Sequence, residues 1–217
     1  MVVVGHLIWP LADLEVVTPR LTLRYINDEL AVELAHVAAA GIHDPATQPF
    51  TEPWTDVPSP QLEQNTLRYF WKCRAETTAD HWDLCLAVVV EEVPIGVCTV
   101  HGEQFPTRRT AETGSWLGRR YQRQGFGLAM RPAALHLLFA GFGAQRATTR
   151  AWHDNTASLG VTRSLPYTQT AVIHEQRRDR LGTTIEFAMT AEQWNTIKRD
   201  DIKLIGVPAV REQLNIS

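Results

Sequence analysis

The chain has 217 residues, of which 44% are hydrophobic and 21% are charged, and its formal net charge is −3. This is the composition of an ordinary globular protein that can bury one large core. The small net charge provides no field that would recruit nucleic acid, so no nucleic-acid partner is expected. The three cysteines (Cys73, Cys85 and Cys98) form no CxxC pair, so neither a disulfide framework nor a metal site is expected.

The N-terminal stretch 1–15 is apolar, but no basic region precedes it and Pro10 and Asp13 interrupt it. It is too short to span a bilayer and does not resemble a signal peptide. We therefore expect a cytoplasmic protein without a membrane partner.

Hydrophobic periodicity predicts strands and helices that alternate along most of the chain. The predicted strands are 20–27, 83–90, 95–102, 111–117, 146–152, 170–176 and 184–190. The predicted helices run from Asn27 or Asp28 to Gly41, over about 59–77, from Gly125 to about 140, from Asn155 to Ser164, and over 191–200, and the proline-rich segment 42–58 is a loop. This order predicts an α/β (α+β) fold with one mixed central β-sheet of six to seven strands flanked by helices. A single domain is expected over 1–217, with its core at about 14–195 and an unassigned tail at 196–217.

The segment YQRQGFG (121–127) connects strand 111–117 to the next helix. Glycine inside a helix costs about 1 kcal/mol relative to alanine, so two glycines at a helix start need a reason. A helix N-terminus presents unpaired N–H groups and partial positive charge, and both favour phosphate. Glycine lets a phosphate approach those donors, so the segment is interpreted as a phosphate-binding turn. A tight turn without a ligand is the alternative.

Two familiar phosphate motifs do not fit this segment. A Walker loop would need a lysine where this chain has Leu128. A dinucleotide-binding turn would need a third glycine where this chain has Met130. Both ligand classes are therefore rejected.

Three motifs in order give the chain a family resemblance. They are PRLTLR (19–24) at the first strand, GSWLG (114–118) followed by Gln122-x-x-Gly125-x-Gly127, and Asn155-x-x-Ser158 on the next short helix. With these motifs the chain resembles the GNAT superfamily of acyl-CoA-dependent N-acyltransferases, in particular its RimJ/RimL-like branch. GIHDP, FTEPWT and GSWLG are also similar to a mycobacterial succinyltransferase of that branch. The resemblance covers about residues 14–195.

The resemblance implies that the cofactor is acetyl-CoA or succinyl-CoA and that strand 111–117 splays from strand 146–152. It implies a pyrophosphate held by the amides of residues 123–128 and a pantetheine arm held near Trp116–Gly118. The implied cofactor-binding residues are Trp116, Leu117, Gly118, Gln122, Arg123, Gln124, Gly125, Phe126, Gly127, Leu128, Asn155 and Ser158.

For the chemistry, the backbone N–H of Leu117 is the candidate that polarises the thioester carbonyl. Many relatives protonate the leaving thiolate with a tyrosine, but this chain has Thr162 at that position. The resemblance instead places Ser158 near the sulfur, and a capping role for its hydroxyl is the alternative. For the base, Glu112 is the first candidate, His101 the second and Glu175 the third, and a water relay without one essential base stays open.

Several departures from the family pattern concern the acyl end of the site. Pro166 replaces a glycine, so the helix that begins at Asn155 is expected to stop by Ser164. The run 128–131 lacks a carboxylate that close relatives carry there. A succinyl carboxylate would need a cation, for which Arg108 or Arg109 is the candidate.

The leading function is transfer of an acyl group, acetyl first and succinyl second, from coenzyme A to a primary amine. The amine acceptor is a small molecule or a protein N-terminus, and loop residues Phe50 and Trp54 are candidate walls of its side of the site. A non-catalytic acyl-CoA-binding module is the alternative function. A homodimer is left open.

Overall fold

The computed structural model describes residue 6 and residues 8–217. The other N-terminal residues, which belong to the stretch 1–15 discussed above, lie outside the described residues. Among the described helices, none is both long and apolar enough to cross a membrane.

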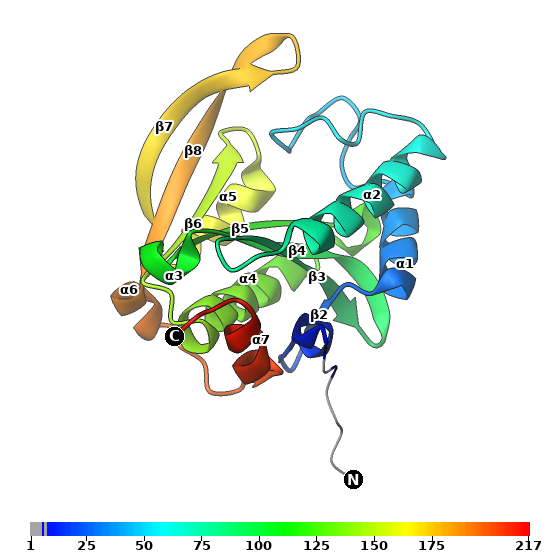
Figure 1. Ribbon diagram of the computed structural model, residues 1–217. Helices are drawn as coiled ribbons and strands as arrows, with labels where there is room; N and C mark the ends of the chain where they lie inside the picture. The colour runs from blue at the N-terminus through cyan, green and yellow to red at the C-terminus, as the bar shows by residue number, and fades with distance from the viewer. Residues whose placement is uncertain (1–5, 7) are drawn as a thin grey trace.

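The described chain folds into alternating strands and helices (Figure 1). In chain order the elements are η1 (Pro10–Asp13), β1 (Glu15–Val17), β2 (Thr22–Tyr25), α1 (Asp28–Ala39), α2 (Gln61–Glu76), β3 (His81–Val90), β4 (Val93–Glu103), α3 (Phe105–Arg108), β5 (Thr110–Leu117), η2 (Arg119–Tyr121), α4 (Phe126–His136), η3 (Leu137–Gly141), β6 (Arg146–Trp152), α5 (Thr156–Arg163), β7 (Thr168–Arg177), β8 (Arg180–Thr190), α6 (Ala191–Asn195), β9 (Lys203–Ile205) and α7 (Val207–Gln213). Segments η1 and η2 are 3-10 turns, and η3 continues α4 as a π-helical segment.

The nine strands form one mixed sheet in the order β7-β8-β6-β5-β4-β3-β2-β1-β9. Neighbouring strands are antiparallel except β5 and β6, which run parallel. The mixed α/β fold predicted from the sequence is confirmed, but the prediction of six to seven strands was too low. The two missed strands, β1 and β9, have three residues each and pair with one another, and so short a strand leaves no alternating pattern to detect.

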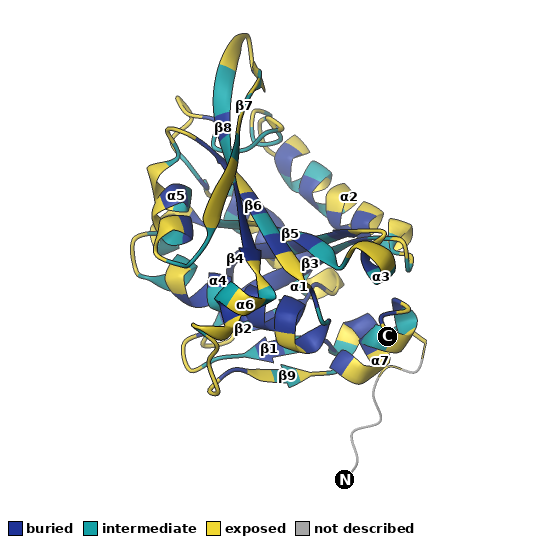
Figure 2. Ribbon diagram, turned by 90° about the vertical axis from the view of Figure 1, so that its left-hand side faces the viewer, coloured by how far each residue is buried: buried dark blue, intermediate teal, exposed yellow. Residues whose placement is uncertain are grey.

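Helices cover both faces of the sheet. Helices α1 and α2 lie on one face and α4 lies on the other (Figures 1 and 2). Figure 2 shows buried residues on one side of α2 and exposed residues on its other side. One buried cluster joins α1 and α2 to the sheet and includes Ala31, Leu34, Phe70, Cys85 and Val97. A larger one joins α4 to the opposite face and includes Leu84, Cys98, Ala111, Met130 and Ala134.

The C-terminal segment belongs to that larger cluster. Val210, Leu214 and Ile216 are buried in it together with Leu11. The predicted helix 191–200 is shorter than expected, because α6 ends at Asn195 and the chain then turns toward β9. The tail that the sequence left unassigned therefore extends the sheet and completes its core.

Strands β5 and β6 separate after three paired positions. The pairs are Thr110↔Arg146, Ala111↔Ala147 and Glu112↔Thr148, and each strand then continues without its neighbour. Two side-chain bonds close the apex of this opening. They join Thr149 Oγ1 to the Thr113 carbonyl (3.0 Å) and Thr113 Oγ1 to the Thr148 carbonyl (3.2 Å). We call the diverging segments 113–117 and 149–152 the β5–β6 fork, and it confirms the predicted splay.

Candidate functional site

The β5–β6 fork exposes backbone groups of β5 that have no partner strand. The amide of Gly118 donates to the Ile95 carbonyl of β4 at 2.9 Å. Because successive residues of a strand point their N–H and C=O groups to opposite sides, Ser115 and Leu117 direct theirs toward the fork. The Thr113 carbonyl, which is two and four residues before Ser115 and Leu117, points to the same side of β5. It accepts a hydrogen bond from Thr149 of β6, as this alternation requires. The Leu117 N–H therefore points into the fork, and its carbonyl-polarising role stays a prediction.

Gln122 fixes the turn that leaves β5. Its side-chain amide donates to the carbonyls of Ile42 (2.6 Å) and Leu117 (2.8 Å). Both of its N–H groups are therefore used within the chain. In this structure Gln122 shapes the turn, and its predicted contact with the cofactor stays a prediction.

The two glycines of the turn have different structural reasons. Gly125 caps α4 in a left-handed conformation with φ of +81°, which glycine adopts without strain. Gly127 lies against α5, and a Cβ built there would be 3.1 Å from Val161 Cγ2. The first glycine therefore shapes the turn, and the second lets α5 pack closely beside the start of α4.

The start of α4 presents unpaired amides. Its first helical bond runs from the Ala129 N–H to the Gly125 carbonyl at 3.2 Å. The N–H groups of Phe126, Gly127 and Leu128 precede that bond and have no helical acceptor. The Leu128 side chain is 53% exposed, so it does not cover them. The positive end of the helix dipole adds to these donors and suits an anion.

Basic side chains surround the turn before α4. One of them, Arg20, was not predicted from the sequence to lie there. Arg20 Nη2 donates to the Gln124 carbonyl at 3.1 Å, and its guanidinium lies 5.5 Å from the centre of the Phe126 ring. Arg120 and Arg123 are exposed, and neither forms an ion pair with a described residue. No spacing rule connects residues that lie 104 positions apart, so no sequence pattern could indicate that Arg20 reaches this turn.

Helix α5 places Asn155 and Ser158 beside the start of α4. Asn155 Oδ1 accepts the Ser158 N–H at 3.1 Å and caps the helix. The Ser158 hydroxyl makes no hydrogen bond with any described residue, so the alternative capping role of that hydroxyl is not seen. Ser158 and Val161 are three residues apart and share a helix face, so Ser158 also faces the turn at Gly127. The helix ends at Arg163 with Ser164 as its cap, as Pro166 predicted.

Charged side chains lie on the α1/α2 face of the sheet beside the fork. Arg150 Nε is 3.5 Å from a carboxylate oxygen of Glu112, and its Nη1 is 3.9 Å from one of Glu175. The second candidate base, His101, stands opposite Glu112 in the β4–β5 register. All three candidate bases therefore lie on the α1/α2 face of the sheet.

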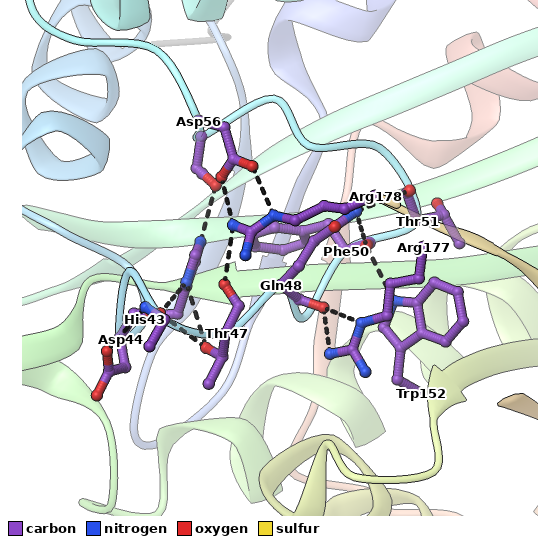
Figure 3. A network of polar contacts seen from close by, with 12 residues as sticks. His43, Asp44, Thr47, Gln48, Phe50, Thr51, Asp56, Trp152, Arg177 and Arg178 are labelled. Carbon is purple, nitrogen blue, oxygen red and sulfur yellow. Dashed lines mark hydrogen bonds and ion pairs between the residues drawn. The ribbon is translucent and has the colours of Figure 1, made fainter. Parts of the chain in front are cut away.

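The loop 42–60, which we call the strap, makes polar contacts with Trp152, Arg177 and Arg178 (Figure 3). Its carboxylate Asp56 accepts two bonds of 2.8 Å from Arg178 at the tip of the β7–β8 hairpin, and these bonds lower the pKa of Asp56. Arg177 Nε donates to the Gln48 carbonyl at 3.0 Å, and Trp152 Nε1 donates to the Phe50 carbonyl at 2.9 Å. These contacts fix the strap to β6 and to the hairpin.

Aromatic rings join the strap to the other arm of the fork. The ring centres of Phe50 and Trp54 are 5.2 Å apart, and those of Trp54 and Trp116 are 6.0 Å apart. The strap therefore runs from Trp116 on β5 to Trp152 on β6. Phe50 and Trp54 therefore lie beside the fork, and their role as walls of the acceptor side stays a prediction.

Arg131 carries a buried charge at the apex of the fork. Its side chain is 3% exposed, and Nη1 donates to Thr113 Oγ1 at 3.0 Å. Nε is buried without a hydrogen-bond partner, and no acidic side chain of the described chain forms an ion pair with it. The sequence carried a signal here, because Arg131 interrupts the apolar stripe of Leu128, Leu135 and Leu138 at helical spacing.

The two arginines predicted to bind an acyl carboxylate have different surroundings. Arg109 donates to the Phe142 carbonyl (3.3 Å) and to the Ser217 carbonyl and hydroxyl (both 2.9 Å). It anchors the C-terminus, so that assignment was wrong for Arg109. Arg108 lines a surface groove of about 500 Å³ with His101, Glu103, Glu112 and Arg146.

A parallel pair of strands that diverges beside a glycine-containing helix start defines the class of acyl-CoA-dependent transferases that the sequence resembles. Comparison with family models gives the family. Residues 20–168, which are more than half of the chain, match the model described as "Acetyltransferase (GNAT) domain". The chain therefore belongs to the GNAT acetyltransferase family and is an N-acyltransferase.

Solved structures of acetyltransferases share this fold. RimL, a ribosomal L7/L12 alpha-N-protein acetyltransferase solved with coenzyme A, superposes with a TM-score of 0.68 at 18% identity, covering 80% of this chain and 96% of RimL. Mycobacterium smegmatis RimJ, solved with a CoA disulfide, gives 0.68 at 18% identity, covering 83% and 87%. A GCN5-related N-acetyltransferase from Brucella melitensis gives 0.67 at 17% identity, covering 85% and 81%. At these identities the likeness supports the fold.

Proposed function

We propose that this chain transfers an acetyl group from coenzyme A directly to a primary amine. The observation that carries the proposal is the β5–β6 fork, which has unpaired strand amides along one arm and unpaired helix amides at its open end. A pantetheine arm is an extended chain with amide groups, so it can pair with β5 as an added strand. The pyrophosphate then reaches the amides of Phe126, Gly127 and Leu128. The structural relatives RimL and RimJ were solved with coenzyme A or its disulfide, which supports this proposal.

The remaining predicted cofactor residues take supporting roles in this proposal. Gly125 shapes the turn, Arg123 and Arg20 supply charge for the phosphates, and Gln124 holds the turn through a 2.8 Å bond to the Arg120 carbonyl. Asn155 fixes the start of α5, which carries the hydroxyl of Ser158. Trp116 to Gly118 and Gln122 hold the end of β5 in place.

The reaction forms a C–N bond and an S–H bond, and it breaks the C–S bond and one N–H bond. The nitrogen of the neutral amine attacks the thioester carbonyl carbon and gives up one proton, the C–S bond breaks, and the sulfur takes one proton to become a free thiol. The Leu117 N–H stabilises the developing negative charge on the carbonyl oxygen, and Ser158 donates the proton to sulfur. Glu112, held by Arg150, attracts the incoming ammonium. Binding both substrates in one site supplies the correct placement.

Thermal stability and thiol release together test this function. Coenzyme A and acetyl-CoA are expected to raise the Tm, and a panel of primary amines with acetyl-CoA is expected to release free thiol. Stabilisation without thiol release for any amine would favour the alternative, a non-catalytic acyl-CoA-binding module. No stabilisation by either compound would reject both.

Succinyl-CoA is the second candidate donor, and Arg131 is the observation that favours it. A buried cation without an acidic partner costs several kcal/mol, and an acyl group that ends in a carboxylate would compensate it. We expect Arg131→Gln to lower kcat/KM for succinyl-CoA about tenfold while changing that for butyryl-CoA, which has the same length and no charge, less than twofold. Steady-state kinetics with both donors measures this. If the ratio of kcat/KM for succinyl-CoA to that for butyryl-CoA stayed the same in Arg131→Gln, Arg131 would not bind the succinyl carboxylate.

We also propose the kind of amine that the site accepts and how the chain assembles. The carboxylates of Glu112 and Glu175 suit a positively charged amine, which a small molecule and a protein N-terminus both provide. We further propose a single domain over the whole chain, a cytoplasmic location and a homodimer. Light scattering on the purified protein tests the homodimer.

A further inference from the structure

A row of polar side chains crosses four strands of the sheet at the level of the apex of the fork. Asp83 of β3 stands opposite His101 of β4, His101 stands opposite Glu112 of β5, and Glu112 stands opposite Thr148 of β6. Glu112↔Thr148 is the last paired position before the fork opens. Residues directly opposite in a sheet have Cβ atoms about 4.5 to 5.5 Å apart, so the row is continuous.

His101 is oriented by its neighbour on β3. Its Nδ1 is 2.8 Å from Asp83 Oδ1. The two ring nitrogens of an imidazole point in different directions, so Nε2 faces away from Asp83, and it makes no hydrogen bond with a described residue. The bond to Asp83 is the main reason that the pKa of His101 is raised above its ordinary value. A carboxylate at Nδ1 fixes the tautomer in which Nε2 carries the lone pair, as in an Asp–His pair of a hydrolase.

Glu112 already has a cation beside it. Its carboxylate lies 3.5 Å from Arg150 Nε. No such cation pairs with His101 among the described residues.

We propose that His101 accepts the proton that the acceptor ammonium must lose before it attacks the thioester, with Asp83 as its positioning residue. This inference rests on the proposed acyl transfer. The proton leaves the ammonium nitrogen, passes through one water, and binds Nε2, and the amine keeps the electron pair that forms the new C–N bond. Glu112 holds the ammonium beside the fork while this occurs.

A second histidine, His81, lies beside His101 on the same face, and both side chains reach solvent. His81 Nδ1 is 2.8 Å from Glu103 Oε2, its Nε2 is 4.0 Å from Asp83 Oδ2, and its ring centre is 5.5 Å from that of His101. The His101 and His81 side chains are 36% and 39% exposed, so each can exchange protons with water. The acidic and other titratable groups around His101 are Asp83 and His81 from β3, Glu103 from β4, Glu112 from β5 and Tyr69 of α2, which lies near Asp83. Two cations, Arg108 of α3 and Arg146 of β6, line the same surface groove as His101.

The test compares His101→Gln and Asp83→Asn with the unchanged chain in a pH profile of kcat/KM for the amine. The rate depends on neutral His101, so the raised pKa places the acidic limb of the profile above the usual histidine value. His101→Gln is expected to lower kcat/KM about 10²-fold at neutral pH and to remove that limb. Asp83→Asn is expected to move the limb to lower pH and to lower the plateau about tenfold, because the weaker base accepts the proton less well.

Matched controls and a second readout separate this inference from the proposed function. His174→Gln and Asp80→Asn replace exposed residues of the same types elsewhere and are expected to change kcat/KM less than twofold. The Kd of acetyl-CoA is expected to stay within twofold in every variant. NMR titration of the His101 ring is expected to show its pKa falling in Asp83→Asn, which a purely structural role would not require.

Two results overturn the inference and leave the acyl transfer standing. The first is a His101→Gln variant that binds acetyl-CoA, keeps its kcat/KM for the amine and keeps the acidic limb of its pH profile. The other is a limb that stays in place in Asp83→Asn while the NMR pKa of His101 falls. Failure of the unchanged chain to bind acetyl-CoA would instead reject the proposed function itself.

Discussion

Gly125→Glu is expected to weaken acyl-CoA binding at least about 10²-fold. Position 125 has φ of +81°, which costs a residue with a side chain roughly 1–2 kcal/mol. A Cβ there would be 3.0 Å from Arg20 Nη1, so the new carboxylate would stand among the proposed phosphate donors and pair with their nearest arginine. It would repel the pyrophosphate and neutralise Arg20 at the same time. Calorimetric titration with coenzyme A measures the loss.

Gly125→Asn is the matched control for backbone strain. Asparagine tolerates the left-handed conformation better than most residues and adds no charge. We expect it to weaken binding by about tenfold or less and to leave Tm nearly unchanged. A Gly125→Glu variant that folds and binds coenzyme A as tightly as the unchanged chain would show that the turn holds no phosphate.

Ser158→Ala is expected to lower kcat by about 10- to 10²-fold and to leave the Kd of acetyl-CoA within twofold. The hydroxyl has no hydrogen-bond partner among the described residues, so its removal breaks no contact of the chain. A free thiol has a pKa of about 8.5, so protonating the thiolate assists its departure without being indispensable. This places the expected effect at the lower end of general acid catalysis. Pre-steady-state thiol release and calorimetry measure the two quantities.

Ser164→Ala provides the control for the loss of a serine on the same helix. Its hydroxyl donates to the Val161 carbonyl at 2.7 Å at the far end of α5. We expect this variant to keep kcat within twofold and to lose a little stability. If Ser158→Ala instead reduced binding and turnover equally, the hydroxyl would contact the cofactor in the ground state and its assigned role would be wrong.

Features set by neighbours along the chain were predictable. The β3–β4 hairpin turns at Glu91 and Glu92, both with positive φ, between the strands predicted over 83–90 and 95–102. Asn155 caps α5, and the residue pair Leu165-Pro166 stops it at Ser164. These outcomes depend on backbone preferences that act over a few residues, and a sequence displays those directly.

Partners that are distant in sequence could not be predicted in the same way. Arg20 reaches the turn before α4, Asp83 meets His101, and Arg109 holds the C-terminus, although no periodic pattern links these residues. Such contacts depend on strand register and on how helices pack, and a shift of one residue would point each side chain to the other face of the sheet.

The amino-acid sequence by itself determined the family, the order of the elements and the glycine-containing turn, because these follow from local backbone chemistry and hydrophobic spacing. The tertiary structure alone decided which charges remain without an acidic partner and which side chains share a row across the sheet. Arg131 is one more basic residue in the sequence, and it becomes a buried cation only where α4 packs beneath Thr113. Burial and register arise from the packing of the whole chain, and the chemistry of the site depends on both.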